Sequence, residues 1–470
     1  MHWLQFRGPN ASGIAPENAD PPIYFSADTN LLWKTEIPSG WSSPCIVNEK
    51  IFLTGFDESD SLLYTFAIDR KNGEVVWQDS LSPKGFTYQH PLQGYASPTI
   101  ASDGKRIFAS FPNYGMVAYD LEGKMIWEYS HEVISRFYNA GTSSPVIMDT
   151  VVVLVVNSKQ DPRIMALDTR SGDSVVKIRA SESEWSSFSC SSTPVVYNDL
   201  LILHLSENLV AYEMTNGILE WWLPTLTTGV GTPVLMNDTL YVNTWHNAGE
   251  RSTRATLPTF AELLEESDKN SNGLVEREEI NDLIILTRPE TPDAPMANVY
   301  VRQLFNSFDW NKDQVFNEEE WLGLIAFVAT YLKDHGMFSL PLGGSGERPH
   351  TDLVWKVNED TPETPSPLVV GGDVMFIKNG GIITVIKRES GKVVHKERIG
   401  AAGTYLSSPL LSGNRIYTCA FNGTVSVLSA DDYSVINHNK LKEKIGASPV
   451  AVDDVLYVRT DKHLFAFREK

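Results

Sequence analysis

One short motif, Ser-Pro or Thr-Pro followed by an apolar run, recurs along almost the whole chain. Each copy continues with further runs rich in β-branched and aromatic residues, separated by turn residues. Four short strands in a unit of about 40 to 50 residues are typical of one blade of a β-propeller. A β-sandwich also has many short strands, but it does not explain eight copies of one motif. The eight prolines of the motif are Pro44, Pro98, Pro145, Pro194, Pro233, Pro367, Pro409 and Pro449.

The residue types in the repeat suggest how each blade is built. Proline lacks an amide hydrogen and suits the first residue of a strand. We expect the preceding Ser or Thr to bond nearby backbone groups and to fix the turn before the strand. The late tryptophans Trp77, Trp127 and Trp221 are predicted to pack between neighbouring blades.

The eighth copy is incomplete, because the chain ends at HLFAFREK after the third strand of that unit. The segment NLLWKTEIP, residues 30–38, looks like a lone fourth strand with its own Trp33. We therefore predict an all-β, eight-bladed propeller of four-stranded blades in which this N-terminal strand completes the last blade. Closure of the ring would hide the sheet edges.

These repeats resemble the repeats of PQQ-type β-propellers. The resemblance rests on the Ser-Pro start, the eight copies and the A-x-D-x-x-x-G-x-x-x-W ending made by Ala67, Asp69, Gly73 and Trp77. It covers nearly all of the chain outside one insert. The opening WLQFRGPN, residues 3–10, is similar to the W-x-x-F-R-G start of a bacterial, usually exported, branch that is similar to the BamB-type propeller. The repeat indicates the fold well and the function poorly.

Quinone-dependent alcohol dehydrogenases share these repeats, and in that family two adjacent cysteines and a tryptophan enclose the quinone. Here Cys45, Cys190 and Cys419 are far apart in the sequence, so we expect no PQQ cofactor. We predict that the three are buried, inert thiols, and one long-range disulfide stays open if the protein is exported.

The step between the fifth and sixth copies is too long, and the extra segment is acidic. Residues 257–336 hold 16 Asp and Glu but only 6 Lys and Arg, within a chain of net charge −20. This charge argues against nucleic acid or anionic membrane surfaces as partners. No apolar run is long enough to predict a transmembrane helix.

The stretch SDKNSNGLVEREEI, residues 267–280, matches the D-x-[DN]-x-[DN]-G-x5-E pattern of an EF-hand calcium loop. Calcium takes six to eight hard oxygen ligands, which this spacing supplies, and Gly273 permits the sharp turn. Leu274 would bind through its carbonyl, Glu276 through a water and Glu279 with both carboxyl oxygens. The predicted ligands are Asp268, Asn270, Asn272, Leu274, Glu276 and Glu279.

A second loop follows in NSFDWNKDQVFNEEEW, where Gln314 stands in place of the usual glycine. We expect Gln314 to adopt a left-handed conformation at some cost, which makes this calcium site the weaker one. Val275 and Phe316 are expected to pair the two loops. The predicted ligands are Asp309, Asn311, Asp313, Val315, Asn317 and Glu320.

The flanks of both loops carry apolar residues at helical spacing and predict four helices, in TFAELLEES, EREEINDLIIL, NVYVRQLFNSF and EEEWLGLIAFVATYLKD. The segment is therefore predicted to be an all-α paired EF-hand that binds two Ca²⁺ ions. The alternative is an acidic hairpin that has lost its metal.

The domain organisation follows. Residues 1–250 form the closing strand, blades one to four and the first half of blade five, residues 251–348 the EF-hand insert, and residues 349–470 the rest of the propeller. The insert is expected between the second and third strands of blade five. TDLVWKV, residues 351–357, should return to that blade with Trp355 as its late tryptophan.

The long loops that lead into the inner strands are expected to line a funnel. Their composition suits a carbohydrate or a peptide, but also ordinary loop packing, and no spacing fixes a catalytic triad. The candidate ligand-binding residues are Trp41, Tyr88, His90, Arg136, Tyr138, Trp185 and His246.

We favour a non-catalytic propeller scaffold that binds a protein or carbohydrate ligand, with structural calcium. The alternative is a lyase or hydrolase that acts on polysaccharide in the funnel. The start MHWLQFRGPN lacks the regions of a signal peptide. We expect an exported protein, periplasmic or extracellular, whose signal peptide was removed, and a cytoplasmic location stays open.

Overall fold

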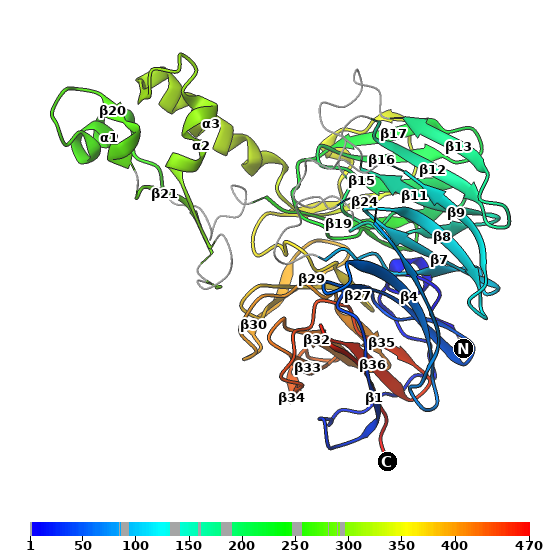
Figure 1. The fold of residues 1–470 in the computed structure, drawn as a ribbon. Coiled ribbons are helices and arrows are strands. Elements are labelled where there is room, and N and C mark those ends of the chain that lie inside the picture. The colour runs from blue at the N-terminus through cyan, green and yellow to red at the C-terminus, as the bar shows by residue number, and fades with distance from the viewer. Residues whose placement is uncertain are drawn as a thin grey trace.

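Eight sheets, seven of four antiparallel strands and one widened to five strands, are arranged as the blades of a β-propeller (Figure 1). The computed structural model describes residues 2–83, 85, 94–131, 142–157, 161–179, 190–246, 256–280, 282–288, 290–291 and 297–470. The predicted eight-bladed fold is confirmed.

Blades one to four each take four consecutive strands, from the inner strand outward. Their strands are β2 (Cys45–Val47), β3 (Lys50–Asp57), β4 (Leu62–Asp69) and β5 (Val75–Leu81); β6 (Ala101–Ser102), β7 (Arg106–Phe111), β8 (Gly115–Asp120) and β9 (Met125–Ser130); β10 (Val146–Met148), β11 (Val151–Val156), β12 (Arg163–Asp168) and β13 (Ser174–Arg179); β14 (Val195–Tyr197), β15 (Leu200–His204), β16 (Asn208–Glu213) and β17 (Ile218–Pro224).

Blade five is interrupted by the insert, and blade eight borrows its outer strand from the N-terminus. The strands of blades five to eight are β18 (Val234–Met236), β19 (Thr239–Thr244), β24 (Gly336–Pro341) and β26 (Trp355–Val357); β27 (Leu368–Val370), β28 (Asp373–Lys378), β29 (Ile382–Lys387) and β30 (Val393–Arg398); β31 (Leu410–Ser412), β32 (Arg415–Cys419), β33 (Thr424–Ser429) and β34 (Val435–Lys440); β35 (Val450–Val452), β36 (Val455–Arg459), β37 (His463–Phe467) and β1 (Leu31–Glu36).

The core lies between the blades. Each blade is covered on both faces by its neighbours, so its second and third strands are apolar runs that are buried along most of their length, as in β3 and β4. The outer strands face solvent and alternate, as β5 does. The predicted repeat of β-branched and aromatic runs therefore corresponds to the buried layers between neighbouring sheets.

The ring is closed by β1, which pairs antiparallel with β37 from Leu31 opposite Phe467 to Glu36 opposite His463. The strand lies near the start of the sequence and its partner near the end, so the two ends of the chain share one sheet. The predicted closing strand is confirmed.

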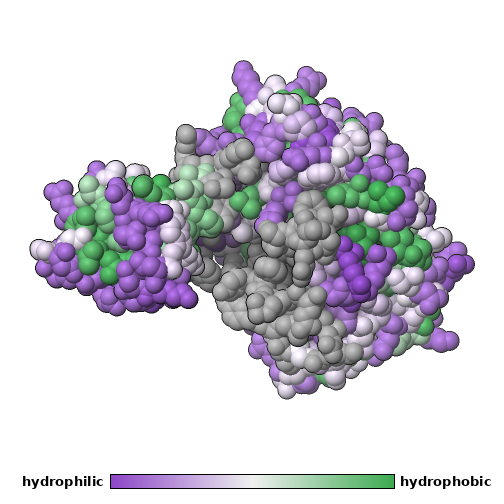
Figure 2. Space-filling view, turned by 90° about the horizontal axis from the view of Figure 1, so that it is seen from above, coloured by the Kyte–Doolittle hydropathy of each residue, from purple (hydrophilic) through white to green (hydrophobic). Residues whose placement is uncertain are grey.

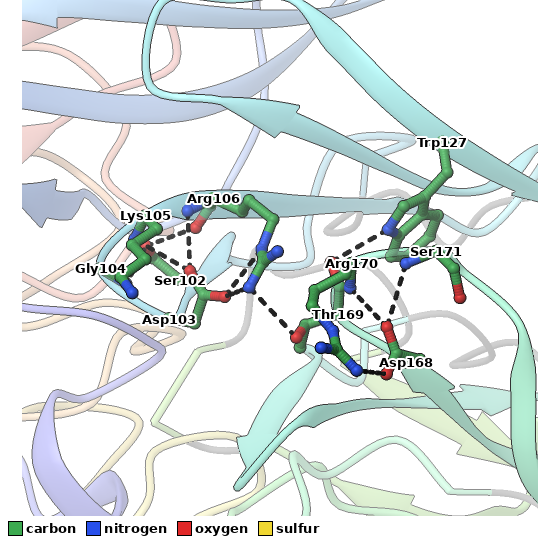
Figure 3. A network of polar contacts seen from close by, with 10 residues as sticks. All are labelled: Ser102, Asp103, Gly104, Lys105, Arg106, Trp127, Asp168, Thr169, Arg170 and Ser171. Carbon is green, nitrogen blue, oxygen red and sulfur yellow. Dashed lines mark hydrogen bonds and ion pairs between the residues drawn. The ribbon is translucent and has the colours of Figure 1, made fainter.

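At four of the eight blade boundaries, a late tryptophan of one blade packs on the glycine turn of the next blade. Trp127 on β9 of blade two donates through Nε1 to the Thr169 carbonyl in the turn of blade three, at 3.1 Å (Figure 3). Asp168 begins that turn and accepts from the Arg170 amide at 2.8 Å. Gly172 completes the turn with φ +75°, and a Cβ there would lie 2.7 Å from the Trp127 ring, so the motif needs a glycine. The same contact recurs for Trp33 on Gly73, Trp77 on Gly123 and Trp355 on Gly391.

The boundary between blades four and five departs from this pattern. A short strand, β25 (Gly346–Glu347), pairs in parallel with β17 and widens blade four to five strands. The Arg348 guanidinium lies 5.9 Å from the Trp221 ring, and the Trp221 side chain is buried. Trp221 thus packs between blades as predicted, but against an arginine.

The insert leaves blade five between its second and third strands and projects from one side of the propeller, with some hydrophobic side chains on its surface (Figure 2). Its elements are α1 (Phe260–Ser267), β20 (Val275–Glu276), the 3₁₀ helix η3 (Arg277–Ile280), β21 (Ile284–Thr287), β22 (Asn298–Tyr300), α2 (Val301–Phe308), β23 (Val315–Phe316) and α3 (Glu318–Asp334).

Two expectations for the insert were wrong. The helix expected over 276–286 is only the turn η3, because Ile284 to Thr287 instead pair with β22 as a two-stranded ribbon whose Ile285 side chain is buried. The insert is therefore not all-α. The sheet of blade five also resumes with β24 at Gly336, earlier than the boundary expected at residue 348. The strand sequence GMFSLP follows closely after the helical sequence of α3, so the sequence pattern did not separate the strand from the insert.

The three cysteines are free and buried, and burial raises the pKa of Cys190 and of Cys419 to about 12. Across the described residues, no helix is both long enough and apolar enough to span a membrane.

Ring closure leads to a prediction for Trp33, which is 7% exposed and donates to the Arg70 carbonyl of blade one at 2.9 Å. The substitution Trp33→Ala should lower the free energy of unfolding by about 3–5 kcal/mol, since it removes a buried ring and its hydrogen bond. Leu32→Ala on the same strand, where the side chain is 37% exposed, should cost less than about 1 kcal/mol. Denaturant titration followed by circular dichroism measures both, and equal losses would contradict a closing role for Trp33.

Candidate functional site

A cavity of about 150 Å³ lies on the propeller axis and is lined by residues from all eight blades and by Phe6 of the N-terminal segment. Most of the described lining residues are Ser or Thr. The residues just before the inner strands form much of the wall, as the sequence predicted for a funnel. A pocket with many hydroxyl groups and a few aromatic rings suits a polar ligand.

Eight hydroxyl groups form a closed ring of hydrogen bonds around this cavity. In each blade one Ser or Thr donates its backbone amide to the Oγ of the equivalent residue in the next blade, at N–O distances of 2.9–3.2 Å. All eight residues are buried and all eight line the cavity. In chain order they are Ser43, Thr99, Ser144, Thr193, Thr232, Ser366, Ser408 and Ser448.

This ring corrects the role expected for the Ser and Thr of the repeat. In seven blades the residue before the proline bonds the neighbouring blade, where we expected it to fix its own turn. Only in blade two does that residue, Ser97, bond locally to the Gly94 carbonyl at 2.9 Å, and Thr99 takes the place in the ring. The hydroxyl of the repeat therefore holds blades together.

The N-terminal segment runs across one end of the ring. Trp3 pairs with Ile46 of blade one, and the Gly13 carbonyl accepts from the Leu411 amide of blade seven at 2.8 Å. Between them the Arg7 guanidinium donates to the Pro367 carbonyl of blade six at 2.7 Å. Phe6, which lines the cavity, thus belongs to a segment that bridges separate blades.

Two arginines are buried beside the hydroxyl ring. Arg7 bonds the carbonyl of Pro367, which follows the ring residue Ser366, and Arg459 bonds the Ser42 carbonyl at 2.9 Å, next to the ring residue Ser43. Burial lowers the pKa of both Arg7 and Arg459 to about 9, so both stay charged at neutral pH. In the part of the chain that the structure describes, neither has an ion-pair partner.

The insert touches the mouth of the cavity. Arg288, just after β21, forms a two-pronged ion pair with the cavity-lining Glu363, with both N–O distances at 3.0 Å. Burial raises the pKa of Glu363, and Arg288 opposes that shift. The neighbouring Glu290 lies 3.2 Å from the Lys378 ammonium of blade six. The ribbon of the insert is therefore anchored to the propeller at the mouth.

The structure describes two of the seven predicted funnel residues, and one of these two lines the cavity. Trp41 lines the cavity and packs against Phe421, with ring centroids 5.6 Å apart. His246 lies at the root of the insert and is not among the described lining residues, and burial, with His335 nearby, lowers its pKa to about 3. The remaining candidates, Tyr88, His90, Arg136, Tyr138 and Trp185, fall outside the described residues.

Sequence reasoning missed Phe6, Glu363 and Arg288. Phe6 lies within the W-x-x-F-R-G opening, so a signal for its importance was present. Glu363 and Arg288 meet only because the insert folds back onto blade six. No spacing pattern in the sequence predicts the contact between Glu363 and Arg288.

The first predicted calcium loop is held by its own carboxylates. Asp268 accepts from the Gly273 amide at 2.7 Å. Glu279 reaches back across the loop, and its two oxygens accept from the amides of Lys269 at 2.9 Å and of Glu276 at 3.0 Å. The first and last acidic residues therefore both point toward the loop backbone.

The second loop repeats these bonds at the equivalent positions. Asp309 accepts from the Gln314 amide at 3.1 Å. Glu320 accepts from the amides of Trp310 at 2.8 Å and of Asn317 at 3.1 Å. The remaining predicted ligand residues of the two loops are Asn270, Asn272, Leu274, Asn311, Asp313 and Val315.

The two loops pair side by side, with Val275 opposite Phe316 in the β20–β23 sheet. Gly273 and Gln314 have φ angles of +79° and +67°, so Gln314 adopts the left-handed conformation that the sequence predicted. Among the residues described, no three His, Cys, Asp or Glu side chains gather as a metal site, and the loop carboxylates accept from backbone amides instead. The donor set, carboxylate and amide oxygens on short loops, is of the hard-oxygen type that calcium takes.

The fold and the repeat define a PQQ-like repeat propeller of eight blades. The chain belongs to the family described as outer membrane protein assembly factor BamB, whose sequence profile matches residues 23–190 and 345–470, more than half of the chain. The unmatched gap contains the insert. A search of curated proteins finds no match.

Solved structures with the same fold include BamB from Moraxella catarrhalis, with 12% identity, a TM-score of 0.54, and 93% of this chain and 98% of that chain covered. A europium-containing methanol dehydrogenase has 10% identity and a TM-score of 0.55, with 99% and 98% covered. Quinohemoprotein alcohol dehydrogenase from Comamonas testosteroni has 9% identity and a TM-score of 0.56, with 99% and 80% covered. These identities establish the fold alone.

The anchor at the mouth gives a prediction. Arg288→Gln removes the ion pair with Glu363, so amide hydrogen exchange in residues 284–288 and 298–300 should speed up at least about tenfold, which corresponds to about 1.4 kcal/mol. Arg170→Gln, an exposed arginine in a turn of blade three, is the control and should leave these rates unchanged. Equal rates in the two variants would show that Glu363 does not anchor the ribbon.

Acid stability gives another prediction, through His204 on β15. This side chain is 3% exposed, and burial lowers its pKa to about 4. Above about pH 6.5 the His204 side chain is neutral in both the folded and the unfolded state. Between pH 6.5 and 4 this side chain binds a proton in the unfolded state but stays neutral in the folded state. His204 should therefore contribute about 3 kcal/mol to the fall in the free energy of unfolding over this range, so His204→Gln should lose about 3 kcal/mol less than the wild-type protein. Urea titrations at each pH test this, with exposed His2→Gln expected to behave as wild type.

Proposed function

We propose that the protein is a non-catalytic binding scaffold whose insert binds two calcium ions as a paired EF-hand. The observation that carries the calcium proposal is the repeated hydrogen bonding of the two loops. Glu279 and Glu320 each reach back to the start of their loop, and the loops pair through β20 and β23. Two unrelated acidic turns would not be expected to repeat the same contacts at equivalent positions, and these two loops lie 41 residues apart in the sequence.

The residues present fit the ion. Asp268 and Glu279 in the first loop, and Asp309 and Glu320 in the second, would bring carboxylate oxygens to each site, with amide and carbonyl oxygens from the residues between them. Asp309 and Glu320 are 4% and 2% exposed, and burial of unpaired carboxylates is costly unless a cation or several donors stabilise them. Gln314 in a left-handed conformation favours weaker binding at the second loop.

We propose a structural role for this calcium. Modular sites of 10⁻⁴–10⁻³ M affinity stay filled in external fluids, which suits an exported protein, periplasmic or extracellular. The first loop lacks the long second helix of a sensor that opens, since η3 and β21 follow it. The insert also exposes Leu322 and Phe327 on α3, which offers a surface to a partner protein.

Binding suits the axial cavity better than acid–base chemistry. Its described lining is rich in hydroxyl groups, and the carboxylate of Glu363 is engaged by Arg288. Trp41 and Phe6 would supply apolar faces to a carbohydrate or peptide segment. We also propose that PQQ is not the ligand, because no two cysteines are adjacent. A polysaccharide lyase or hydrolase stays the alternative, and product formation from a glycan panel would support it.

Calorimetric titration with Ca²⁺ tests the proposal. The wild-type protein should bind two ions, and Glu279→Gln and Glu320→Gln should each remove or weaken at least tenfold one binding event, since each loses a two-oxygen ligand. Glu319→Gln makes the same charge change at an exposed neighbour and should keep both events.

Two results of this titration would contradict the calcium proposal. If wild type gives no saturable heat, or if all three variants bind alike, the loops are hydrogen-bonded turns and the insert is not an EF-hand pair. Hydrogen exchange with and without Ca²⁺ then separates the two halves of the proposal, because the propeller should keep its protection when the loops lose theirs.

A further inference from the structure

The hydroxyl ring offers donors to the cavity that the protein does not use. Each of the eight Oγ atoms accepts an amide hydrogen from the previous blade. Within the described part of the chain, none of the eight hydroxyl groups donates to a protein atom. Because all eight line the cavity, their O–H groups are available to whatever fills it.

These donors are stronger than isolated hydroxyls. An oxygen that accepts a hydrogen bond becomes more polarised and donates its own hydrogen more readily, and the low dielectric of a buried wall adds to this. The lining therefore presents many donors around one small space. A ligand rich in acceptor oxygens would satisfy them.

Two buried cations lie beside the ring. Arg7 and Arg459 are both fully buried, and each bonds a backbone carbonyl next to a ring residue. The Nη1 atom of Arg7 and the Nε atom of Arg459 form no hydrogen bond to the described protein atoms. Two buried cations without a carboxylate partner are costly, and a nearby anion would offset that cost.

The shape of the cavity fits a small occupant. The cavity holds about 150 Å³ and is lined both by Phe6 of the N-terminal segment and by Glu363, which pairs with Arg288 of the insert. The only carboxylate among the described lining residues is thus already neutralised.

We propose that the axial cavity binds a small oxyanion or carboxylate through the hydroxyl ring. The ligand oxygens would accept from several ring hydroxyls at once, in the field of Arg7 and Arg459. Such charge-assisted bonds are about twice as strong as neutral ones. This proposal rests on the binding role proposed for the cavity, but it is independent of the calcium loops.

Equilibrium dialysis with labelled inorganic phosphate, in calcium-free buffer at constant ionic strength, tests the proposal. The wild-type protein should bind about one phosphate per chain, and unlabelled sulfate and succinate should displace it while glucose does not. The double variant Thr193→Val, Thr232→Val keeps the side-chain shape but removes two donors, so affinity should fall at least about tenfold.

The matched control is Thr193→Ser, Thr232→Ser, which restores both hydroxyls and should bind within about twofold of wild type. If the valine variant unfolds, the serine variant and the displacement series still decide the matter. Thr384→Val changes a buried threonine away from the cavity and reports any general cost of the substitution.

Peptides distinguish the source of the anion. An extended peptide with a free C-terminal carboxylate that displaces phosphate, when its amidated form does not, identifies a chain end as ligand. Failure of both peptides while phosphate binds identifies a free ion. Absence of saturable phosphate binding, or equal binding by the valine variant, overturns the proposal. If the amidated peptide or a glycan binds but no anion does, the anion proposal fails and the proposed binding role of the cavity stands. If none of these ligands binds, the proposed binding role fails as well.

Discussion

The propeller depends on the closure of its ring in two places, near the axis and at the outer rim. Near the axis, eight amide-to-hydroxyl bonds pass from blade to blade and return to the start, so each bond is constrained by the other seven. At the rim, β1 completes blade eight, and Trp33 lies on the Gly73 turn of blade one. A sheet edge left open would offer unpaired backbone groups to other chains. Closure pairs the edge of β37 with β1 and holds the eight blades around the axial cavity at the same time.

The same closure explains why the cavity is polar inside a mainly apolar protein. Side chains between the blades are buried against neighbouring sheets, and only the inner ends of the blades face the axis. Ser and Thr there satisfy the amides of adjacent blades and still present hydroxyl groups inward. Arg7 and Arg459 hold carbonyls beside this ring, so structural contacts also set the charge around the cavity.

The insert adds a second structural unit without breaking the first. It interrupts blade five between β19 and β24, yet these strands pair along their full length, from Thr239 opposite Pro341 to Thr244 opposite Gly336. The ribbon of β21 and β22 brings Arg288 to the mouth, which links the insert to the cavity. This ribbon is thus a direct contact between the insert and the mouth of the cavity.

The sequence by itself determined the number of blades, the closing strand, the position of the insert and the two acidic loops, because each has a local period or a fixed spacing. It also placed Gln314 in a left-handed turn. It did not determine that the ring hydroxyls bond between blades, that residues 277–280 form a turn and residues 284–287 a strand, or that Glu363 meets Arg288. Those outcomes depend on contacts between residues distant in the chain. Only the tertiary structure decides such contacts, since local propensity yields wherever burial and pairing favour another conformation.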